Sequence, residues 1–509
     1  MAASLDFLSN PIFISVITAS FLLLLFHYIN NQPQQHGKKY HPTGASVFHL
    51  FINFKKMHHY MTDLATKYKT YRIFNPIHGA VYTSDPTNVE CILKTNFKNY
   101  GKGDYTHSIS SDLLGDGIFT VDGDQWREQR KVSSQEFSTK ILRDSSSVIF
   151  RSNTIKLGKI LSQAADSNQI IDINDLFMKA TTDSIFKVGF GIDLDNLSGR
   201  NEEGVRFSRA FDDANNLLYT RFVDVSWKIK RFLNIGAEAE LKKNMKIVDE
   251  FVYKVIQVKI EQMQKSKDES LFKKEDILSR FIQVHDKDPK YLRDIILNFV
   301  LAGKDPIAIS MSWFIYMLCK HPEVQDKVAK EIIEATNMNK EITDVAGFAA
   351  RVSDSALEKM QYLHAALTET IRLYPALPVD PKVCFSDDVL PDGCNVNKGD
   401  VVGYLPYAMG RMKFIWGDDA LEFKPKRWLD QDGCFHQESP FKFTAFQAGL
   451  GRDFAYRQLK IISSALLGCF VFKLSNENID LQYRTSINIH VDGPLQVYVS
   501  RRSAGFLKP

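Results

Sequence analysis

The chain has 509 residues, of which 44% are hydrophobic and 24% are charged, so it is long and apolar enough to bury a large core. Its formal net charge of +4 is small for this length, and no basic block is interleaved with aromatic residues, which argues against a nucleic-acid-binding protein. Six cysteines without a C-x-x-C pair argue against a disulfide scaffold and a structural zinc site, and they favour a reducing environment.

The N-terminal stretch 12–29 is apolar apart from three hydroxyl residues and one histidine. As a helix with a rise of about 1.5 Å per residue, it can just cross a hydrocarbon core of about 30 Å. Only Asp6 precedes the apolar stretch, and two lysines, Lys38 and Lys39, follow it. A cleaved signal peptide would have the opposite charge order, with positive charge before the apolar stretch. By the positive-inside rule, the lysines place the rest of the chain in the cytoplasm. We therefore predict a single-pass transmembrane signal anchor over residues 1–30. A secretory signal that is removed is the alternative.

Residues 31–46 are polar and contain two prolines and two glycines, which predicts a hinge rather than a continuous helix. No second linker, repeat or low-complexity tract interrupts residues 47–509, so we predict one domain there. Apolar residues recur at helical spacing over 245–264 and 290–320, whereas β-like runs are few and short. The predicted fold class is mostly α with a minor β portion.

Trp126 and Arg130 lie four residues apart in D-Q-W-R-E-Q-R-K, so they share one face of a helix. An arginine in this setting can give charge-assisted hydrogen bonds to a carboxylate. An ordinary solvated arginine beside a half-buried tryptophan is the alternative.

The apolar run 297–314 reads L-N-F-V-L-A-G-K-D-P-I-A-I-S-M-S-W-F and predicts a buried helix that contains Asp305 and Pro306. Proline at this place removes the hydrogen bond to the carbonyl of Ala302 and is expected to kink the helix. An ordinary kinked core helix would show the same pattern.

Glu369 and Arg372 form an opposite-charge pair at i, i+3 in L-T-E-T-I-R-L-Y-P, on a helix that Pro375 helps to end. Such a pair at a surface contributes only a few tenths of a kcal/mol and is common. Its context is more informative, because Arg427 follows 55 residues later in F-K-P-K-R-W and Phe446 another 19 residues on.

Residues 446–458 read F-Q-A-G-L-G-R-D-F-A-Y-R-Q, a glycine-containing loop that leads into an amphipathic helix. The G-L-G within it lacks the third glycine and the βαβ context of a dinucleotide-binding fingerprint. No P-loop, H-E-x-x-H or G-x-S-x-G motif is present in the chain.

Taken in chain order, W-x-x-x-R, A-G-x-D, E-x-x-R, P-x-R and this loop resemble the motifs of the cytochrome P-450 superfamily, whose haem loop reads F-x-x-G-x-R-x-C-x-G. D-I-L-S-R-F at 276–281, Y-A-M-G-R-M at 407–412 and F-A-Y-R-Q are similar to the plant clan of fatty-acid ω-hydroxylases. The resemblance implies the cytochrome P-450 fold with an N-terminal transmembrane anchor in the endoplasmic reticulum membrane. It also implies a haem-dependent monooxygenase that hydroxylates long-chain fatty acids with dioxygen and with electrons from an NADPH-dependent reductase.

The same resemblance implies roles for individual residues. Asp305 would be catalytic, on the oxygen-activation helix. The haem-binding residues would be Trp126, Arg130, Phe446, Gly449 and Gly451, and a buried structural triad would consist of Glu369, Arg372 and Arg427.

Two departures set this chain apart from the family pattern. About four positions, including the cysteine that ligates the iron, are missing between Gly449 and Leu450, so no protein metal ligand is predicted. Pro306 stands where the family has a threonine whose hydroxyl assists oxygen activation. We therefore predict an impaired or inactive monooxygenase, in which haem is the cofactor that the resemblance implies and the missing cysteine weakens its binding. The alternatives are an active enzyme with a sequence error in the loop, and a membrane-tethered lipid-binding pseudoenzyme.

Overall fold

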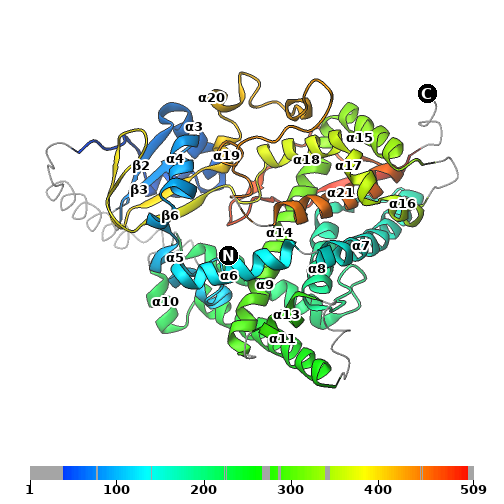
Figure 1. Cartoon of the computed structure of the whole chain (residues 1–509), viewed down its shortest axis with the longest axis horizontal. Coiled ribbons are helices and arrows are strands. Elements are labelled where there is room, and N and C mark those ends of the chain that lie inside the picture. The colour runs from blue at the N-terminus through cyan, green and yellow to red at the C-terminus, as the bar shows by residue number, and fades with distance from the viewer. Residues whose placement is uncertain are drawn as a thin grey trace, which may run out of the picture. The chain divides into compact units, whose positions relative to one another are not determined.

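The computed structural model describes residues 38–75, 78–138, 140–222, 224, 226–265, 276–284, 288–338, 344–447, 449 and 451–502 (Figure 1). The predicted anchor over 1–30 and the first part of the predicted hinge lie outside the described residues. The chain divides into two compact units, which we describe separately. The first comprises Met1–Asn53, Asp63–Gly101 and Pro381–Tyr404, and the second comprises Phe54–Thr62, Lys102–Asp380 and Leu405–Pro509.

The first unit is built on a six-stranded sheet in the order β1-β2-β3-β9-β6-β4, in which β2 runs antiparallel to β3 and β3 runs parallel to β9. A short hairpin of β7 and β8 accompanies it. The strands are β1 Thr43–Ser46, β2 Thr70–Phe74, β3 Ala80–Thr83, β4 Tyr100–Gly101, β6 Asp380–Cys384, β7 Asp388–Val389, β8 Asn395–Val396 and β9 Val401–Tyr404. The helices are α2 Val47–Ile52, α4 Pro86–Glu90 and the second half of α3 Met57–Tyr68, with the short turns η2 Cys91–Thr95 and η3 Phe97–Asn99.

The second unit is mostly helical and contains one large apolar core. Its longer helices are α5 Gly103–Leu114, α6 Gly123–Ser138, α7 Lys140–Asp166, α8 Ile173–Phe190, α9 Glu202–Thr220, α11 Ala237–Lys265, α14 Pro289–Lys320, α15 Pro322–Ala335, α18 Gln361–Leu373 and α21 Arg452–Cys469. The shorter ones are η1 Phe54–Lys56, α10 Trp227–Leu233, α13 Ile277–Val284, α16 Val345–Arg351, α17 Asp354–Lys359, α19 Pro406–Met409, α20 Lys413–Trp416 and η4 Pro425–Trp428.

Two small sheets complete this unit. One has the order β10-β13-β5 and the other pairs β11 with β12. These strands are β5 Ile171–Asp172, β10 Phe470–Leu474, β11 Tyr483–Arg484, β12 His490–Val491 and β13 Gln496–Arg501. The predicted fold class, mostly α with a minor β portion, is confirmed.

Helix α14 is the central element of the second unit. It begins where the side chain of Asp288 accepts a hydrogen bond from the backbone nitrogen of Lys290 at 3.0 Å, with Pro289 in the first turn, an arrangement that favours helix initiation. Most of its apolar residues are buried against α8, α11, α18 and α21. Among the described residues it is the one helix long and apolar enough to cross a membrane, but its burial is that of a core helix.

A buried aromatic cluster holds His58 between Tyr407 and Tyr483, with ring centroids 5.7 and 5.2 Å away. Neither ring nitrogen of His58 has a hydrogen-bond partner. Burial, aided by the nearby charges of His59 and Arg411, lowers the pKa of His58 from 6.5 to about 3. The folded protein therefore holds this imidazole neutral where the unfolded chain would already be protonated.

We expect this cluster to make stability depend on pH. The unfolded chain binds a proton at His58 below about pH 6.5, whereas the folded protein does not do so until about pH 3. The free energy of unfolding therefore keeps the full His58 contribution above about pH 6.5 and should fall by about 3 kcal/mol as the pH drops to about 4. His58→Phe should flatten that part of the urea-unfolding profile between pH 7.5 and 4, whereas His436→Phe, at an exposed position, should leave it unchanged. Equal pH slopes for His58→Phe and the unaltered chain would contradict this assignment.

Candidate functional site

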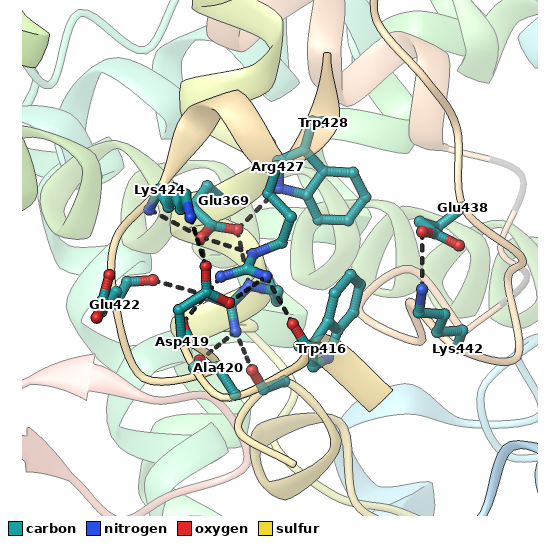
Figure 2. Close-up of polar contacts among 12 residues, drawn as sticks. Glu369, Trp416, Asp419, Ala420, Glu422, Lys424, Arg427, Trp428, Glu438 and Lys442 are labelled. Carbon is teal, nitrogen blue, oxygen red and sulfur yellow. Dashed lines mark hydrogen bonds and ion pairs between the residues drawn. The ribbon is translucent and has the colours of Figure 1, made fainter. Parts of the chain in front are cut away.

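Glu369 and Arg372 of α18 are fully buried and joined by two hydrogen bonds, from Nε to Oε2 at 2.7 Å and from Nη2 to Oε1 at 2.8 Å. Arg427 of η4 brings its Nε to 3.4 Å from Oε1 of the same carboxylate, and Trp428 donates its indole N–H to Oε2 at 2.8 Å (Figure 2). The structure thus brings together the three residues of the predicted triad. The indole donor was not part of the prediction.

The remaining guanidinium donors of the triad bind backbone carbonyls between residues 410 and 422. Arg372 donates to the carbonyls of Gly410, Ala420 and Glu422. Arg427 donates to the carbonyls of Trp416 and Asp419 at 2.7 and 2.9 Å. A Cβ at Gly410 would lie 2.0 Å from the carbonyl oxygen of Arg372, so this packing requires glycine. The network ties the segment 410–422, which includes α20, to α18 and leaves the buried charges of the triad paired.

Asp305 of α14 is buried in an ionic cluster. Its Oδ1 accepts a hydrogen bond from Lys304 at 3.1 Å, and Lys304 also pairs with Asp212 of α9. His490 lies 3.9 Å from the other carboxylate oxygen. Burial opposes ionisation, but Lys304 and His490 outweigh it and hold the pKa of Asp305 below its ordinary value. A carboxylate held ionised beside a buried lysine is suited to fix helix positions, and the catalytic role of Asp305 stays a prediction.

One stripe of α14 remains open to solvent while most of the helix is buried. Ala302 is exposed and Pro306, four residues on and therefore on the same face, is half-buried. Neither Pro306 nor the buried Ile307 carries a hydroxyl group. The hydroxyl one turn further on, that of Ser310, donates to the carbonyl oxygen of Pro306 at 2.7 Å. The helix therefore presents small apolar groups at the predicted oxygen-activation position.

Trp126 and Arg130 lie on α6 and are both half-buried, with the guanidinium carbon 5.8 Å from the indole centroid. Lys102 adds a second cation, its Nζ 5.1 Å from the same centroid. Burial lowers the pKa of Arg130. Cations gathered around one aromatic ring suit the acidic edge of a ligand, such as a haem propionate.

The described part of the loop between Thr444 and α21 contains a tight turn. The backbone nitrogen of Gly449 donates to the carbonyl oxygen of Phe446 at 2.6 Å, and Gly451 is the residue that precedes the first turn of the helix. The ring of Phe446 packs on Tyr456, with centroids 5.2 Å apart. The sequence from 446 to 451 contains neither cysteine nor histidine, so this loop offers no soft ligand for a metal.

The cysteines of the second unit lie elsewhere. Cys469 is the last residue of α21, about 26 Å along the helix axis from its start, and Cys319 lies about 20 Å along α14 from Pro306. Burial raises the pKa of both thiols to about 12. The third, Cys434, is an exposed thiol in the turn after η4.

The residues of this site fit only part of a haem group. The cations at Trp126 suit its acidic edge, and the open stripe of α14 suits a flat apolar face. The loop before α21 supplies no thiolate. The donor set therefore does not fit a haem-thiolate centre.

The family model for cytochrome P450 matches residues 40–496 of this chain. The chain belongs to the cytochrome P450 family. The suspected family is thus confirmed, and with it the expectation of haem as the family's cofactor and monooxygenation as the family's reaction. The mostly helical fold with a minor sheet portion agrees with this family.

Curated plant relatives match nearly the whole chain. Cytochrome P450 704C1 of Pinus taeda is 50% identical over 484 residues, which cover 91% of this chain and 92% of the relative. Cytochrome P450 704B1 of Arabidopsis thaliana is 43% identical over 510 residues, which cover 93% and 96%. Cytochrome P450 94A2 of Vicia sativa is 35% identical over 481 residues, which cover 91% of each. The similarity spans both compact units.

Sequence reasoning missed two members of this site, Lys304 and Lys102. A signal for Lys304 was present, because a lysine inside an apolar run rarely stays buried without a carboxylate partner. Nothing in the sequence pairs it with Asp212, which lies 92 residues earlier.

Proposed function

We propose that this chain is a cytochrome P450 that has lost monooxygenase catalysis while keeping the family's fold. The observation that carries the proposal is the loop from Phe446 to Gly451, which joins α21 without a cysteine. In this family the axial thiolate donates electron density that favours cleavage of the O–O bond, and other protein side chains do not replace it. The thiols of Cys319 and Cys469, whose pKa partial burial raises to about 12, lie too far along their helices to serve instead.

A second element of the same site supports the proposal. Pro306 and Ile307 supply no hydroxyl on α14, and the Ser310 hydroxyl is engaged by the carbonyl oxygen of Pro306. Proton delivery by a positioned group contributes about 10²–10⁴-fold to rates. A sequence error confined to the loop would not explain this change, because it lies some 140 residues away.

We propose a long-chain fatty acid as the ligand class, with ω-hydroxylation as the ancestral reaction. The similarity of D-I-L-S-R-F and Y-A-M-G-R-M to the fatty-acid ω-hydroxylase clan supports this choice. The structure also gives a physical reason for the glycine of Y-A-M-G-R-M. Any side chain at Gly410 would collide with the backbone of Arg372, whose guanidinium binds the carbonyl of Gly410. The open, apolar stripe at Ala302 is compatible with an alkyl chain.

The test is turnover of the full chain reconstituted with an NADPH-dependent reductase and a long-chain fatty acid. We expect no hydroxylated product above the level without protein, together with saturable fatty-acid binding if a lipid-binding role persists. Turnover at the rate of an active relative would overturn the proposal.

Sequencing the transcript across residues 446–458 tests the alternative of a sequence error. An intact F-x-x-G-x-R-x-C-x-G in the transcript would identify the printed loop as an error.

For location, we propose the endoplasmic reticulum membrane, with a single span over 1–30 and the large domain cytoplasmic. Helix α10 supports membrane contact, because Ile229, Phe232 and Leu233 are 64%, 88% and 54% exposed on a helix that also carries Lys228, Lys230 and Arg231. Exposed apolar residues on one face of a helix, with basic residues beside them, are typical of a helix that lies in a membrane interface.

We expect the full chain to remain in the microsomal pellet after washing with alkaline carbonate, which removes peripheral proteins but leaves spanning helices in place. The apolar stretch over 12–29 is the reason. Immunoblotting of pellet and supernatant provides the measurement. Release of most of the chain into the supernatant would contradict the predicted anchor.

A further inference from the structure

Three side chains with metal-binding atoms meet in the sheet-containing unit. His41 comes from the segment just before β1, and Asp392 and Cys394 come from the turn between β7 and β8. One potential ligand atom from each lies within 4.8 Å of the other two. Because His41 and Asp392 are 351 residues apart in sequence, no spacing motif reveals the cluster.

Both parts of the cluster are held in place by backbone hydrogen bonds. The carbonyl oxygen of Lys39 accepts bonds from the backbone nitrogen and the side-chain amide of Asn395, at 2.7 and 2.9 Å. The turn is closed by a bond from the Leu390 nitrogen to the Cys394 carbonyl at 2.9 Å, and Gly393 takes the positive φ of 79° that this turn needs. The ligand atoms therefore converge without rearrangement of the main chain.

The carboxylate of Asp392 is oriented by several donors. Its Oδ2 lies 2.8 Å from Nε2 of His41 and accepts a bond from the side-chain amide of Asn88 at 2.8 Å. Its Oδ1 accepts a bond from the backbone nitrogen of Cys394 at 3.1 Å. Fixed outer partners such as Asn88 are a regular feature of metal sites, where they orient the ligands.

The imidazole of His41 supplies a second, independent observation. Its side chain is only 4% exposed, and its Nδ1 has no hydrogen-bond partner. A buried ring nitrogen left unpaired carries a desolvation penalty of about 1–3 kcal/mol. His41 therefore has one ring nitrogen without a hydrogen bond, on a buried ring whose other nitrogen lies against the Asp392 carboxylate. The Cys394 thiol belongs to the same cluster.

We propose that His41, Asp392 and Cys394 bind a divalent transition-metal ion, Zn²⁺ in the first place. One imidazole nitrogen, one carboxylate oxygen and the Cys394 thiolate would be the ligands, with water in the fourth position. The thiol proton is released to solvent when the ion binds. A nitrogen, oxygen and sulfur donor set suits Zn²⁺ and its neighbours, whereas Mg²⁺ and Ca²⁺ prefer oxygen alone. The ion would fasten the segment before β1 to the β7–β8 hairpin.

The first test uses Co²⁺ as a spectroscopic probe for Zn²⁺ on the full chain in detergent, after treatment with a chelator. We expect one equivalent of Co²⁺ to give a thiolate-to-metal charge-transfer band that Zn²⁺ displaces. Cys394→Ser should remove the band, Asn88→Ala should weaken binding about 10-fold or more, and Cys434→Ser should leave both unchanged. A missing band, or a band that survives Cys394→Ser, would overturn the proposal.

The second test needs no variant and is independent of fold defects. Alkylation of thiols in the unaltered chain, followed by mass spectrometry, reports each cysteine separately. We expect Zn²⁺ to slow labelling of Cys394 about 10-fold or more while labelling of the exposed Cys434 stays constant. Equal rates at Cys394 with and without Zn²⁺ would contradict the site. Neither readout depends on haem or on turnover, so the monooxygenase proposal is tested separately.

Discussion

Inserting Ala-Arg-Ala-Cys between Gly449 and Leu450 is expected to give the chain a thiolate-ligated haem spectrum. The insertion restores F-x-x-G-x-R-x-C-x-G around Phe446, Gly449 and Gly451, residues that the chain already has. It places the new thiol shortly before the start of α21, where the partial positive charge of a helix N-terminus favours the thiolate. The measurements are the reduced, carbon-monoxide-bound difference spectrum and a haem assay. We expect a thiolate-type Soret band that the unaltered chain lacks, together with about one haem per chain.

The matched control inserts Ala-Arg-Ala-Ser at the same place and keeps the loop length. This control should show no thiolate band, and it therefore separates the effect of the sulfur atom from the effect of the longer loop. Adding Pro306→Thr to the cysteine insertion should then raise fatty-acid turnover by about 10²-fold, because it returns a hydroxyl to α14. A cysteine insertion that retains stoichiometric haem but shows no thiolate band would contradict our account of the loop.

Glu369→Ala is expected to lower the free energy of unfolding by about 3–5 kcal/mol. The carboxylate is fully buried and accepts hydrogen bonds from Arg372, Arg427 and Trp428. Its removal leaves a buried guanidinium without a counter-charge and frees the segment 410–422 that the network positions. Urea unfolding followed by circular dichroism provides the measurement.

A control lies in the same region of the structure. Glu438 and Lys442 form a partly exposed pair with an N···O distance of 2.7 Å (Figure 2). Because solvent screens such pairs, Glu438→Ala should change stability by less than about 0.5 kcal/mol. A loss below about 1 kcal/mol for Glu369→Ala, similar to the control, would show that the triad does not stabilise the fold as its burial implies.

Features encoded locally were predictable from the sequence. Helical periodicity over 290–320 corresponds to α14, Pro289–Lys320, because a long apolar run at helical spacing has few other ways to be buried. Glu369 and Arg372 could be paired because they lie one helical turn apart. The order of motifs then placed Arg427 beside them, although spacing alone could not show that its other donors bind the carbonyls of Trp416 and Asp419.

Features created by the fold were not predictable. Lys304 meets Asp212 across 92 residues, and His41 meets Asp392 across 351. Such contacts depend on how helices and strands pack against one another, and short sequence patterns do not predict that packing. Glycine 410 is a similar case, since its requirement comes from the nearby carbonyl of Arg372 and not from a turn of its own. The surroundings of Asp305 were not predictable for the same reason, because its neighbour Lys304 pairs with Asp212 of α9 and His490 comes from β12. The catalytic role of Asp305 stays a prediction.

The most direct test of the lost thiolate is the difference spectrum of the unaltered full chain, reduced and exposed to carbon monoxide, with haem quantified in the same sample. The loop from Phe446 to Gly451 contains no cysteine, and Cys319 and Cys469 are distant and protonated. We predict haem below one equivalent and no thiolate-type Soret band. A normal thiolate-type band with one haem per chain would contradict the account.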